Sequence, residues 1–367
     1  MRALFFIDSL GSGGAQRQII NLATGFTDRG YDVDLVIYHE GSNFFRDLVT
    51  KSGINLIAID SRSGFSLSVL ICLIKRLYFI RYVAAISFLR SPNIYLCLAK
   101  ILSFTSVPII VSERSCMKYD TNRLSSFLCK ILYSAADFVV SNSLTNSSYL
   151  AQSFWLRPKV KTIYNGFKLK PYNSFCRQTI SSSNFSLLVV GRINYVKNGL
   201  RLLRALLLFN ARNGFIPQLY WVGRQDSDFR SLSLRSDMDD LISNHPCLST
   251  NVHFVGECKD INPWIEKTHV LIHVSLYEGL PNAICEAFIN GQPVIASNVC
   301  DHPDLLKDGQ RGILCDPQSE LSICSAIESF YSLPPIQRHE MTSSARLFAE
   351  KNLSFDLLTR NFISLIR

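Results

Sequence analysis

The sequence lacks any run of 18 or more apolar residues that is free of charges, although 47% of its 367 residues are hydrophobic. A helix that spans a bilayer needs roughly 20 consecutive apolar residues, so we expect no spanning helix. Charged residues are also few, at 18%, which is typical of a globular rather than a disordered chain. One Arg, five apolar residues and Asp8 follow the first Met, a pattern that favours a first strand over a signal peptide.

Several motifs of metal and nucleophile chemistry are also absent. The 11 cysteines form no C-x-x-C pair and are odd in number, which indicates reduced, buried thiols of a cytosolic protein. The histidines have no zinc-like spacing, and there is no G-x-S-x-G elbow. Asp237-x-Asp239 has the form of an acidic metal motif, but its polar surroundings favour a solvated helix face. We therefore expect no metal and no cofactor.

The formal net charge of +9 indicates an anionic partner: nucleic acid, a phosphorylated substrate or an anionic membrane. No familiar nucleic-acid motif is present, so nucleic acid is not expected. Basic and aromatic residues are interleaved in 74–82, where Lys75, Arg76 and Arg81 lie among large apolar residues. Such a helix could contact lipid headgroups or simply pack on the sheet. A second basic segment contains Arg157, Lys159, Lys161, Lys168 and Lys170.

Short apolar runs alternate with longer helical patterns, which predicts an α/β fold with parallel sheets covered on both faces. In the first half the strands are expected at 3–8, 32–38, 54–59, 83–89, 107–113 and 137–142, with helices at 15–29, 66–81, 123–135 and 143–152. In the second half they are expected at 185–190, 217–222, 251–255, 269–274 and 293–297.

The length exceeds that of one ordinary core and predicts two doubly wound domains facing each other across a cleft. We expect the first domain at 1–168 and a linker at 169–184, which is rich in Ser, Asn and Pro. The second domain is expected at 185–350. The last segment, 351–367, is expected to form a helix that crosses back to the first domain. Ligands of such sheets bind beyond the carboxyl ends of the strands.

The loop after the first strand contains Gly11, Gly13 and Gly14 and leads into a helix. Glycines can adopt backbone conformations closed to other residues, and a helix N-terminus favours an anion. A dinucleotide site would need Gly where this chain has Gln16, although Glu40 could still bind a ribose. A tight turn without a ligand is the other alternative.

Two cations, Arg192 and Lys197, flank the loop after the first strand of the second half. A guanidinium fork, an ammonium and the N–H groups of the following helix would suit a diphosphate. The alternative is that both are solvated surface charges.

Two acids lie eight positions apart in the stretch EGLPNAICEAF, which begins at Glu278. Pro281 is favoured in a first helical turn, so a helix is expected from Pro281 to about Asn290, with Gly291 ending it. Glu286 then lies more than one turn inside the helix, on the same face as Asn282. A nucleotide sugar could bridge this geometry, with helix N–H groups on its phosphates. Two solvated acids on a surface helix are the alternative.

These residues resemble the retaining, nucleotide-sugar-dependent glycosyltransferases of family GT4, which have the GT-B fold. The family mark is E-G-x-P-x-x-x-x-E-A, and this chain matches it from Glu278 to Ala287. GRINYVKN is similar to the family's basic diphosphate loop, and SLGSGGAQRQ to its N-domain glycine loop. TIYNGF and PDLLKDGQRGILCDP also resemble family segments, so the likeness covers nearly the whole chain in the expected order.

The resemblance implies roles by position. Glu286 would bind the ribose hydroxyls, Glu278 would lie by the donor sugar, and Arg192 and Lys197 would neutralise the leaving diphosphate. The donor-binding set would be Gly13, Gly14, Arg192, Lys197, Glu278, Gly279, Leu280, Pro281, Asn282 and Glu286. The first domain would bind the acceptor.

The chain also departs from the family pattern. Gln16 stands where many relatives have Glu, and Glu113 and Arg114 stand where many have a His near the reaction centre. We expect Glu113 or Arg114 to meet acceptor or donor sugar, with Glu113 in the catalytic set and Gln16 beside the acceptor. Arg224 replaces a glycine motif and leaves the base contacts open. His302 is expected to be structural rather than catalytic.

The resemblance implies transfer of a hexose or N-acetylhexosamine, with UDP-sugars favoured, to a sugar hydroxyl with retention at the anomeric carbon. The expected acceptor is an oligosaccharide on a polyprenyl diphosphate lipid, in O-antigen, lipopolysaccharide or capsule synthesis. The expected location is the cytoplasmic face of the inner membrane, with peripheral contact to anionic lipid. A sugar-nucleotide epimerase of the same fold and a non-catalytic nucleotide-sugar-binding protein remain as alternatives.

Overall fold

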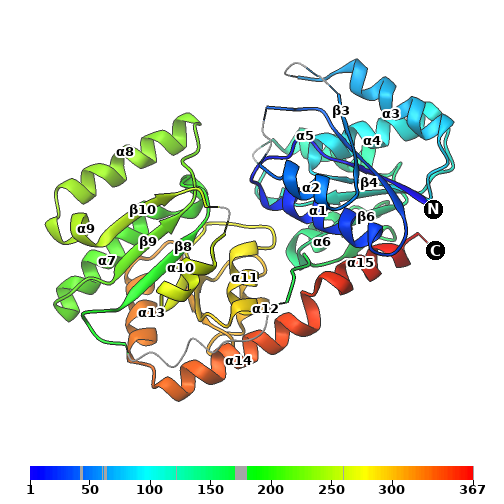
Figure 1. Cartoon of the computed structure of the whole chain (residues 1–367). Helices are drawn as coiled ribbons and strands as arrows, with labels where there is room; N and C mark the ends of the chain where they lie inside the picture. The colour runs from blue at the N-terminus through cyan, green and yellow to red at the C-terminus, as the bar shows by residue number, and fades with distance from the viewer. Residues whose placement is uncertain are drawn as a thin grey trace. The chain divides into compact units, whose positions relative to one another are not determined.

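The structure is a computed structural model that describes residues 1–41, 44–59, 61, 64–120, 122–169, 180–258 and 260–366. The chain divides into two compact units: unit 1 comprises Met1–Lys168 and Asn352–Arg367, and unit 2 comprises Leu169–Lys351. Each unit holds one parallel sheet with helices on both faces, so the predicted doubly wound α/β fold is confirmed (Figure 1). Most of the predicted linker, 170–179, and with it Lys170, lies outside the described residues.

Unit 1 contains a seven-stranded sheet in the order β3-β2-β1-β4-β5-β6-β7. Its central strands are buried along almost their whole length, and parallel strands covered on both faces read as continuous apolar runs for this reason. The strands are β1 (Arg2–Phe6), β2 (Asp32–Ile37), β3 (Asn55–Ala58), β4 (Ala84–Phe88), β5 (Ile109–Glu113), β6 (Phe138–Ser141) and β7 (Val160–Thr162).

The helices of unit 1 form two layers, each closing one apolar core cluster. One layer contains α3 (Leu67–Phe79), α4 (Arg90–Ser103) and α5 (Arg123–Tyr133), with α4 between the other two. The other contains α1 (Gly14–Thr27), α2 (Arg46–Lys51) and α15 (Phe355–Ser364). The short helices η1 (Met117–Tyr119) and α6 (Leu144–Ala151) complete the unit.

The C-terminal segment belongs to unit 1 because it pairs and packs there. Phe167 and Ser354 form a parallel bridge, and α15 packs on α1 with Leu358 and Phe362 in the core. The approach of the two helices is close: a Cβ on Gly25 would lie 2.2 Å from Thr359 Oγ1. A side chain at this position is therefore excluded by packing.

Unit 2 contains a six-stranded sheet in the order β10-β9-β8-β11-β12-β13. Its strands are β8 (Ser186–Val190), β9 (Gln218–Val222), β10 (Val252–Gly256), β11 (Val270–His273), β12 (Val294–Ser297) and β13 (Ile313–Cys315). Its helices are η3 (Tyr195–Lys197), α7 (Gly199–Asn213), α8 (Phe229–Ser243), α9 (Pro246–Asn251), α10 (Asn262–Lys267), α11 (Asn282–Asn290), α12 (His302–Leu306), α13 (Glu320–Ser332) and α14 (Pro335–Asn352).

The predicted strands and helices named above are all present, with ends shifted by at most two residues except in the last helix, which is Phe355–Ser364 where 351–367 was expected. Strands β7 and β13 were not predicted, because each has only three residues and is not buried on both faces. Asp237 and Asp239 lie on α8, where Asp239 pairs with Arg235 one turn away, so the predicted solvated helix face is confirmed. Within the described ranges, every helix falls short of the length and apolarity that a membrane crossing needs.

The contact between α1 and α15 can be tested with Gly25→Val. The added side chain overlaps Thr359, so we expect unit 1 to lose about 1–3 kcal/mol of unfolding free energy, measured by urea denaturation. Thr359→Ala in the same chain should recover part of the loss. A loss that Thr359→Ala leaves unchanged would contradict the packing explanation.

Candidate functional site

The sheet of unit 2 reverses its direction of growth between β8 and β11. The chain runs from β8 outward to β9 and β10 and returns on the other side with β11. At such a switch point the loops after the two strands diverge and leave a crevice beyond the carboxyl ends. Arg192 and Lys197 follow β8, and Glu278 follows β11. Three predicted site residues therefore follow the two strands on either side of this switch point.

An ion pair joins these two loops. Lys197 Nζ donates a hydrogen bond to Glu278 Oε1 at 2.6 Å, and His273 Nε2 lies 3.3 Å from the same oxygen. The side chains of Lys197 and Glu278 are only 16% and 18% exposed, and His273 is buried. The pair is largely screened from water. Each side chain therefore relies on its partner, rather than on solvent, to stabilise its charge.

The protonation states follow from burial and from this contact. Burial alone would raise the pKa of the Glu278 carboxyl, but Lys197 and His273 outweigh it and hold that pKa well below its usual range. Burial and the charge of Lys197 lower the pKa of His273, although Glu278 acts in the opposite direction. At neutral pH the site therefore holds a carboxylate, an ammonium and a neutral imidazole.

The loop after β8 is built to hold Lys197 in place. Asn194 caps η3 by accepting a hydrogen bond from the Lys197 N–H. Asn198 adopts a left-handed conformation, with φ of 59°, and donates to the carbonyls of Val274 and Pro317. Gly191 has φ of 151°, and a Cβ there would lie 2.8 Å from Lys197 Cε. Backbone conformation and packing together leave little choice at Gly191.

Arg192 lies apart from this pair. Its side chain is 59% exposed, and its Nη1 lies 3.1 Å from the carboxylate of Asp226, which Asn194 also contacts. The two predicted cations are thus differently placed, with Lys197 held inward and Arg192 near the surface. Asp226 was not predicted, because it lies 34 residues from Arg192 in a loop after β9.

The helix expected to start at Pro281 starts one residue later, which corrects the prediction. Pro281 is the N-cap of α11, with φ of −76° and ψ of 104°, and its carbonyl accepts from the Cys285 N–H. Gly291 ends the helix with φ of 70°, as predicted. Asn282 and Glu286 lie on one face and are half-buried.

The loop that follows Glu278 contains a buried side chain, that of Leu280. This burial leaves only the backbone of Leu280 for the predicted donor contact. Gly279 and Pro281 flank it in the same loop.

Sequence reasoning missed an aromatic cluster beside Glu278. The guanidinium of Arg230 lies 3.2 Å from the ring centroid of Tyr195. Burial raises the pKa of Tyr277, with Arg230 acting in the opposite direction. The available signal was that Tyr195 lies two residues before Lys197 and Tyr277 directly before Glu278 in the sequence.

His302 lies beside His273, with ring centroids 5.5 Å apart. It is fully buried, and its Nδ1 donates to the Ser297 carbonyl at 2.8 Å. Burial and the neighbouring His273 lower its pKa to about 3, so it is neutral at physiological pH.

In unit 1 the glycine loop follows β1, at the switch point between β1 and β4. Gln16 Nε2 donates to Asp8 Oδ1 at 2.9 Å. Gly13 has an ordinary extended conformation, with φ of −75°, so the expected special backbone conformation is wrong at this position. A Cβ at Gly13 would lie 2.1 Å from Gln16 Oε1, so the Gln16 side chain would have to shift to admit one. Gly14 is the first residue of α1.

Glu113 and Arg114 lie at the end of β5, one strand away from that switch point. Glu113 is fully buried; it accepts hydrogen bonds from Ser115 at Oε1 and from Tyr133 at Oε2. Arg114 Nη1 donates to Asn165 at 2.6 Å, and its guanidinium stacks 3.6 Å from the Phe88 ring centroid. Burial lowers the pKa of Arg114 to about 9, although Glu113 opposes the shift. These contacts position both side chains within unit 1, and their predicted sugar contacts stay predictions.

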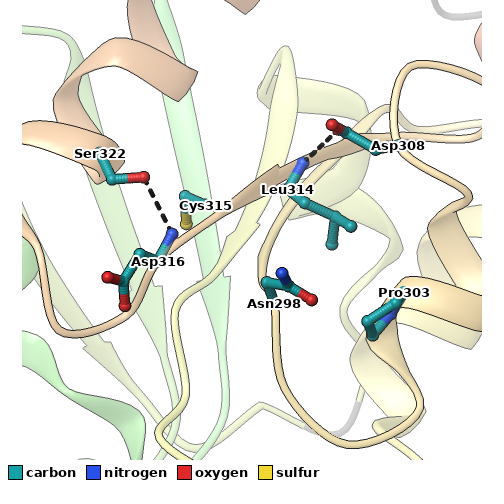
Figure 2. A pocket seen from close by; sticks show the side chains of 7 residues that line it. All are labelled: Asn298, Pro303, Asp308, Leu314, Cys315, Asp316 and Ser322. Carbon is teal, nitrogen blue, oxygen red and sulfur yellow. Dashed lines mark hydrogen bonds between the residues drawn. The ribbon is translucent and has the colours of Figure 1, made fainter.

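A pocket of about 480 Å³ lies at the β13 side of unit 2 (Figure 2). Two of its lining side chains are engaged with backbone: Asp308 accepts from the Leu314 N–H, and Ser322 from the Asp316 N–H. None of the predicted site residues lines it. Among the described residues, no group of three or more His, Cys, Asp or Glu is arranged to hold a metal ion, and the ten described cysteines are free thiols.

Both units of the chain match family models of glycosyltransferases. Residues 12–170 match the model described as Glycosyltransferase Family 4, and residues 184–332 match that described as Glycosyl transferases group 1. Two Campylobacter jejuni proteins are similar over most of their length. One, an α-1,4-N-acetyl-D-galactosaminyltransferase acting on a GalNAc-containing diphospho-undecaprenol saccharide, is 25% identical over 89% of this chain and 88% of its own. The other, an N-acetylgalactosamine-N,N′-diacetylbacillosaminyl-diphospho-undecaprenol 4-α-N-acetylgalactosaminyltransferase, is 23% identical over 96% and 97%.

Among solved structures, Anabaena HepE in complex with UDP-glucose has a similar fold. The TM-score is 0.84 with 19% identity, covering 99% of this chain and 98% of HepE. A TarM structure gives a TM-score of 0.77 with 12% identity, covering 100% and 98%. At these identities the likeness concerns the fold.

The electrostatic account of Glu278 predicts the behaviour of Lys197→Met. Without the ammonium, burial dominates, so the pKa of Glu278 should rise above its usual value, as measured by carbon-13 NMR titration of its carboxyl. The wild-type pair stabilises the fold only while Glu278 is ionised. The difference in unfolding free energy between the wild type and Lys197→Met, about 3–5 kcal/mol, should therefore be full at neutral pH and vanish as pH falls through the lowered pKa of Glu278. A pKa left unchanged by the substitution would contradict this account.

Proposed function

Because the chain belongs to the family 4 glycosyltransferases, which have the GT-B fold, we propose that it moves a hexose or N-acetylhexosamine from a nucleotide diphosphate sugar to a sugar hydroxyl. UDP-sugars are the favoured donors, and the anomeric configuration is retained. The proposed acceptor is a lipid-linked oligosaccharide of bacterial surface polysaccharide synthesis.

The ion pair at the switch point of unit 2 carries the proposal. A buried, ionised Glu278 can accept hydrogen bonds from sugar hydroxyls but has no proton to give a leaving group. Its role is therefore to orient the donor rather than to act as a general acid. Glu286, eight residues on and half-buried on α11, would hold the ribose hydroxyls.

The reaction breaks the bond between the anomeric carbon and the diphosphate oxygen, and negative charge grows on the diphosphate. Fixed positive charges lower the barrier when they are aimed at this charge in a site shielded from water. Lys197 is largely screened from water and would supply one such charge, and Arg192 would reach outward from the same loop to supply another. The first N–H groups of α11 would add donors without proton transfer. The acceptor hydroxyl attacks the same face of the anomeric carbon and gives its proton to the departing diphosphate oxygen, which accounts for retention.

The names of the relatives support the acceptor class and the donor base. Both Campylobacter proteins are named for saccharides on diphospho-undecaprenol, and the HepE complex contains UDP-glucose. By analogy we propose a polyprenyl diphosphate carrier and a site of action at the cytoplasmic face of the inner membrane. The acceptor would be bound by unit 1, with Gln16, Glu113 and Arg114 as its predicted contacts, and Gly13 and Gly14 near the donor phosphates.

Glu286→Ala tests the donor site directly. Loss of the ribose hydrogen bonds should weaken donor binding by about 1–3 kcal/mol, measured by calorimetry with UDP-N-acetylgalactosamine and UDP-glucose. Glu266→Ala on α10 removes an exposed carboxylate from the same unit and should leave the affinity unchanged. Equal affinities for the two variants would count against the ribose assignment.

Turnover tests the activity itself. The chain, incubated with radiolabelled nucleotide sugars and bacterial lipid extract, should move label into the lipid fraction with the α configuration of the donor. Glu278→Gln should lower kcat by about 100-fold while the chain stays folded. Conversion of the donor without any acceptor would favour the epimerase. No turnover with any donor, despite binding, would leave only the non-catalytic nucleotide-sugar-binding role.

A further inference from the structure

The positive charge of the chain is concentrated in one part of unit 1. Residues 61–170 contain 15 of the 38 Lys and Arg but only 3 of the 29 Asp and Glu. This stretch has a formal charge of +12, whereas the rest of the chain has −3. It includes the whole layer of α3, α4 and α5, whose helices contain no acidic residue (Figure 1).

The same layer carries a large set of exposed apolar side chains, which we call the apolar face. It is the outer side of α3, α4 and α5 with the adjoining loop residue Phe154. Phe79, Phe104 and Phe154 are 76%, 94% and 81% exposed. The other large members are Leu67, Ile71, Tyr78, Ile101, Leu102, Leu124, Phe127, Leu128 and Ile131. Exposed apolar side chains gathered in this way indicate an interaction surface.

Helical periodicity explains how α5 can be apolar on both sides. Its inner side packs on the core through Cys129 and Tyr133. Its outer side repeats at three and four residues through Leu124, Phe127 and Ile131. Core packing accounts for the inner row only. The outer row stays exposed, at 68% for Leu124, 49% for Phe127 and 47% for Ile131.

Contacts between neighbouring segments make the face continuous. Trp155 links the loop to α5: its ring lies 6.3 Å from that of Phe127 and 5.0 Å from that of Phe154. Thr105, just after α4, donates to the Leu77 carbonyl of α3. The apolar side chains at these helix ends therefore lie on adjoining elements of one surface.

Two kinds of cation accompany the apolar face. Arg76 forms a salt bridge with Asp34 at 3.2 Å, and Lys100 forms one with Asp137 at 2.5 Å. The charges of these two cations are therefore locally compensated. Lys75, Arg81 and Arg123 are exposed and form no salt bridge with another described residue. Lys75 lies one turn from Ile71 and from Phe79, on the apolar side of α3.

We propose that the apolar face of unit 1 docks on a bilayer of anionic phospholipid, with its large apolar side chains inserted between the headgroups. Lys75, Arg81 and Arg123 would contact the phosphates. A bilayer surface matches both properties of the face, because headgroups attract cations and the acyl boundary accepts apolar side chains. A two-fold contact between copies of the chain would instead place this cationic layer against itself.

Docking needs neither donor nor acceptor, so vesicle binding tests it separately from the proposed transfer reaction. The full chain is mixed with phosphatidylcholine vesicles, with or without phosphatidylglycerol, and the bound fraction is measured by flotation. We expect binding to the anionic vesicles and its weakening at high salt.

Two double variants separate the apolar and the charge contribution. Phe127→Ser with Leu128→Ser should weaken binding by about ten-fold or more, because both side chains are outward on α5. Leu321→Ser with Leu347→Ser, on unit 2 and of similar exposure, is the matched control and should bind as wild type. Lys75→Glu with Arg81→Glu should weaken binding by about five-fold for each positive charge lost. Lys51→Glu with Lys351→Glu is the control for the charge variant, because it makes the same change of net charge outside the apolar face.

The outcomes decide the proposal. Equal binding of the face variants and their controls would overturn it. So would a concentration-dependent dimer in lipid-free sedimentation that Phe127→Ser with Leu128→Ser abolishes, since the face would then be a contact between copies. Thermal melting of each variant, followed by circular dichroism, shows whether a loss of binding comes from unfolding.

Discussion

The ion pair between Lys197 and Glu278 is the constraint on which the architecture of unit 2 depends. A carboxylate with most of its surface withdrawn from water is costly unless a cation and hydrogen bonds compensate it. The cation comes from the loop after β8 and the carboxylate from the loop after β11. The left-handed Asn198 and the side-chain-free Gly191 can be understood as consequences, because each keeps that loop where the ammonium reaches Glu278.

The layer beneath the pair keeps its charges fixed. His273 and His302 are both buried and neutral at physiological pH, and their rings lie 5.5 Å apart. An added proton on either imidazole would be repelled by Lys197, so the site holds one negative and one positive charge over a wide pH range. Such a preorganised arrangement suits a reaction in which charge develops on a departing diphosphate and no side chain has to titrate.

Sequence reasoning reached the fold through the alternation of apolar runs and reached α11 through Pro281 and Gly291, because these are local signals. It could not reach the contact between Lys197 and Glu278, which joins residues 81 positions apart. It also allowed Gly13 a special backbone conformation, whereas the structure shows an ordinary extended one. His273 falls within the strand predicted at 269–274, and its side chain is buried there. Its contact with Glu278 is a tertiary property that the local pattern does not contain.

The distribution of charge separates two kinds of recognition in one chain. Residues 169–351, which form unit 2 with its predicted donor site, hold 17 basic and 18 acidic residues, so no strong net field draws an anion to this unit. A diphosphate must be recognised there by a few fixed groups, of which Lys197 already has a counter-ion. The overall charge of +9 therefore carries no information about the donor. It arises from residues 61–170, whose exposed cations surround apolar side chains, and a surface of that kind attracts extended anionic partners rather than a single nucleotide.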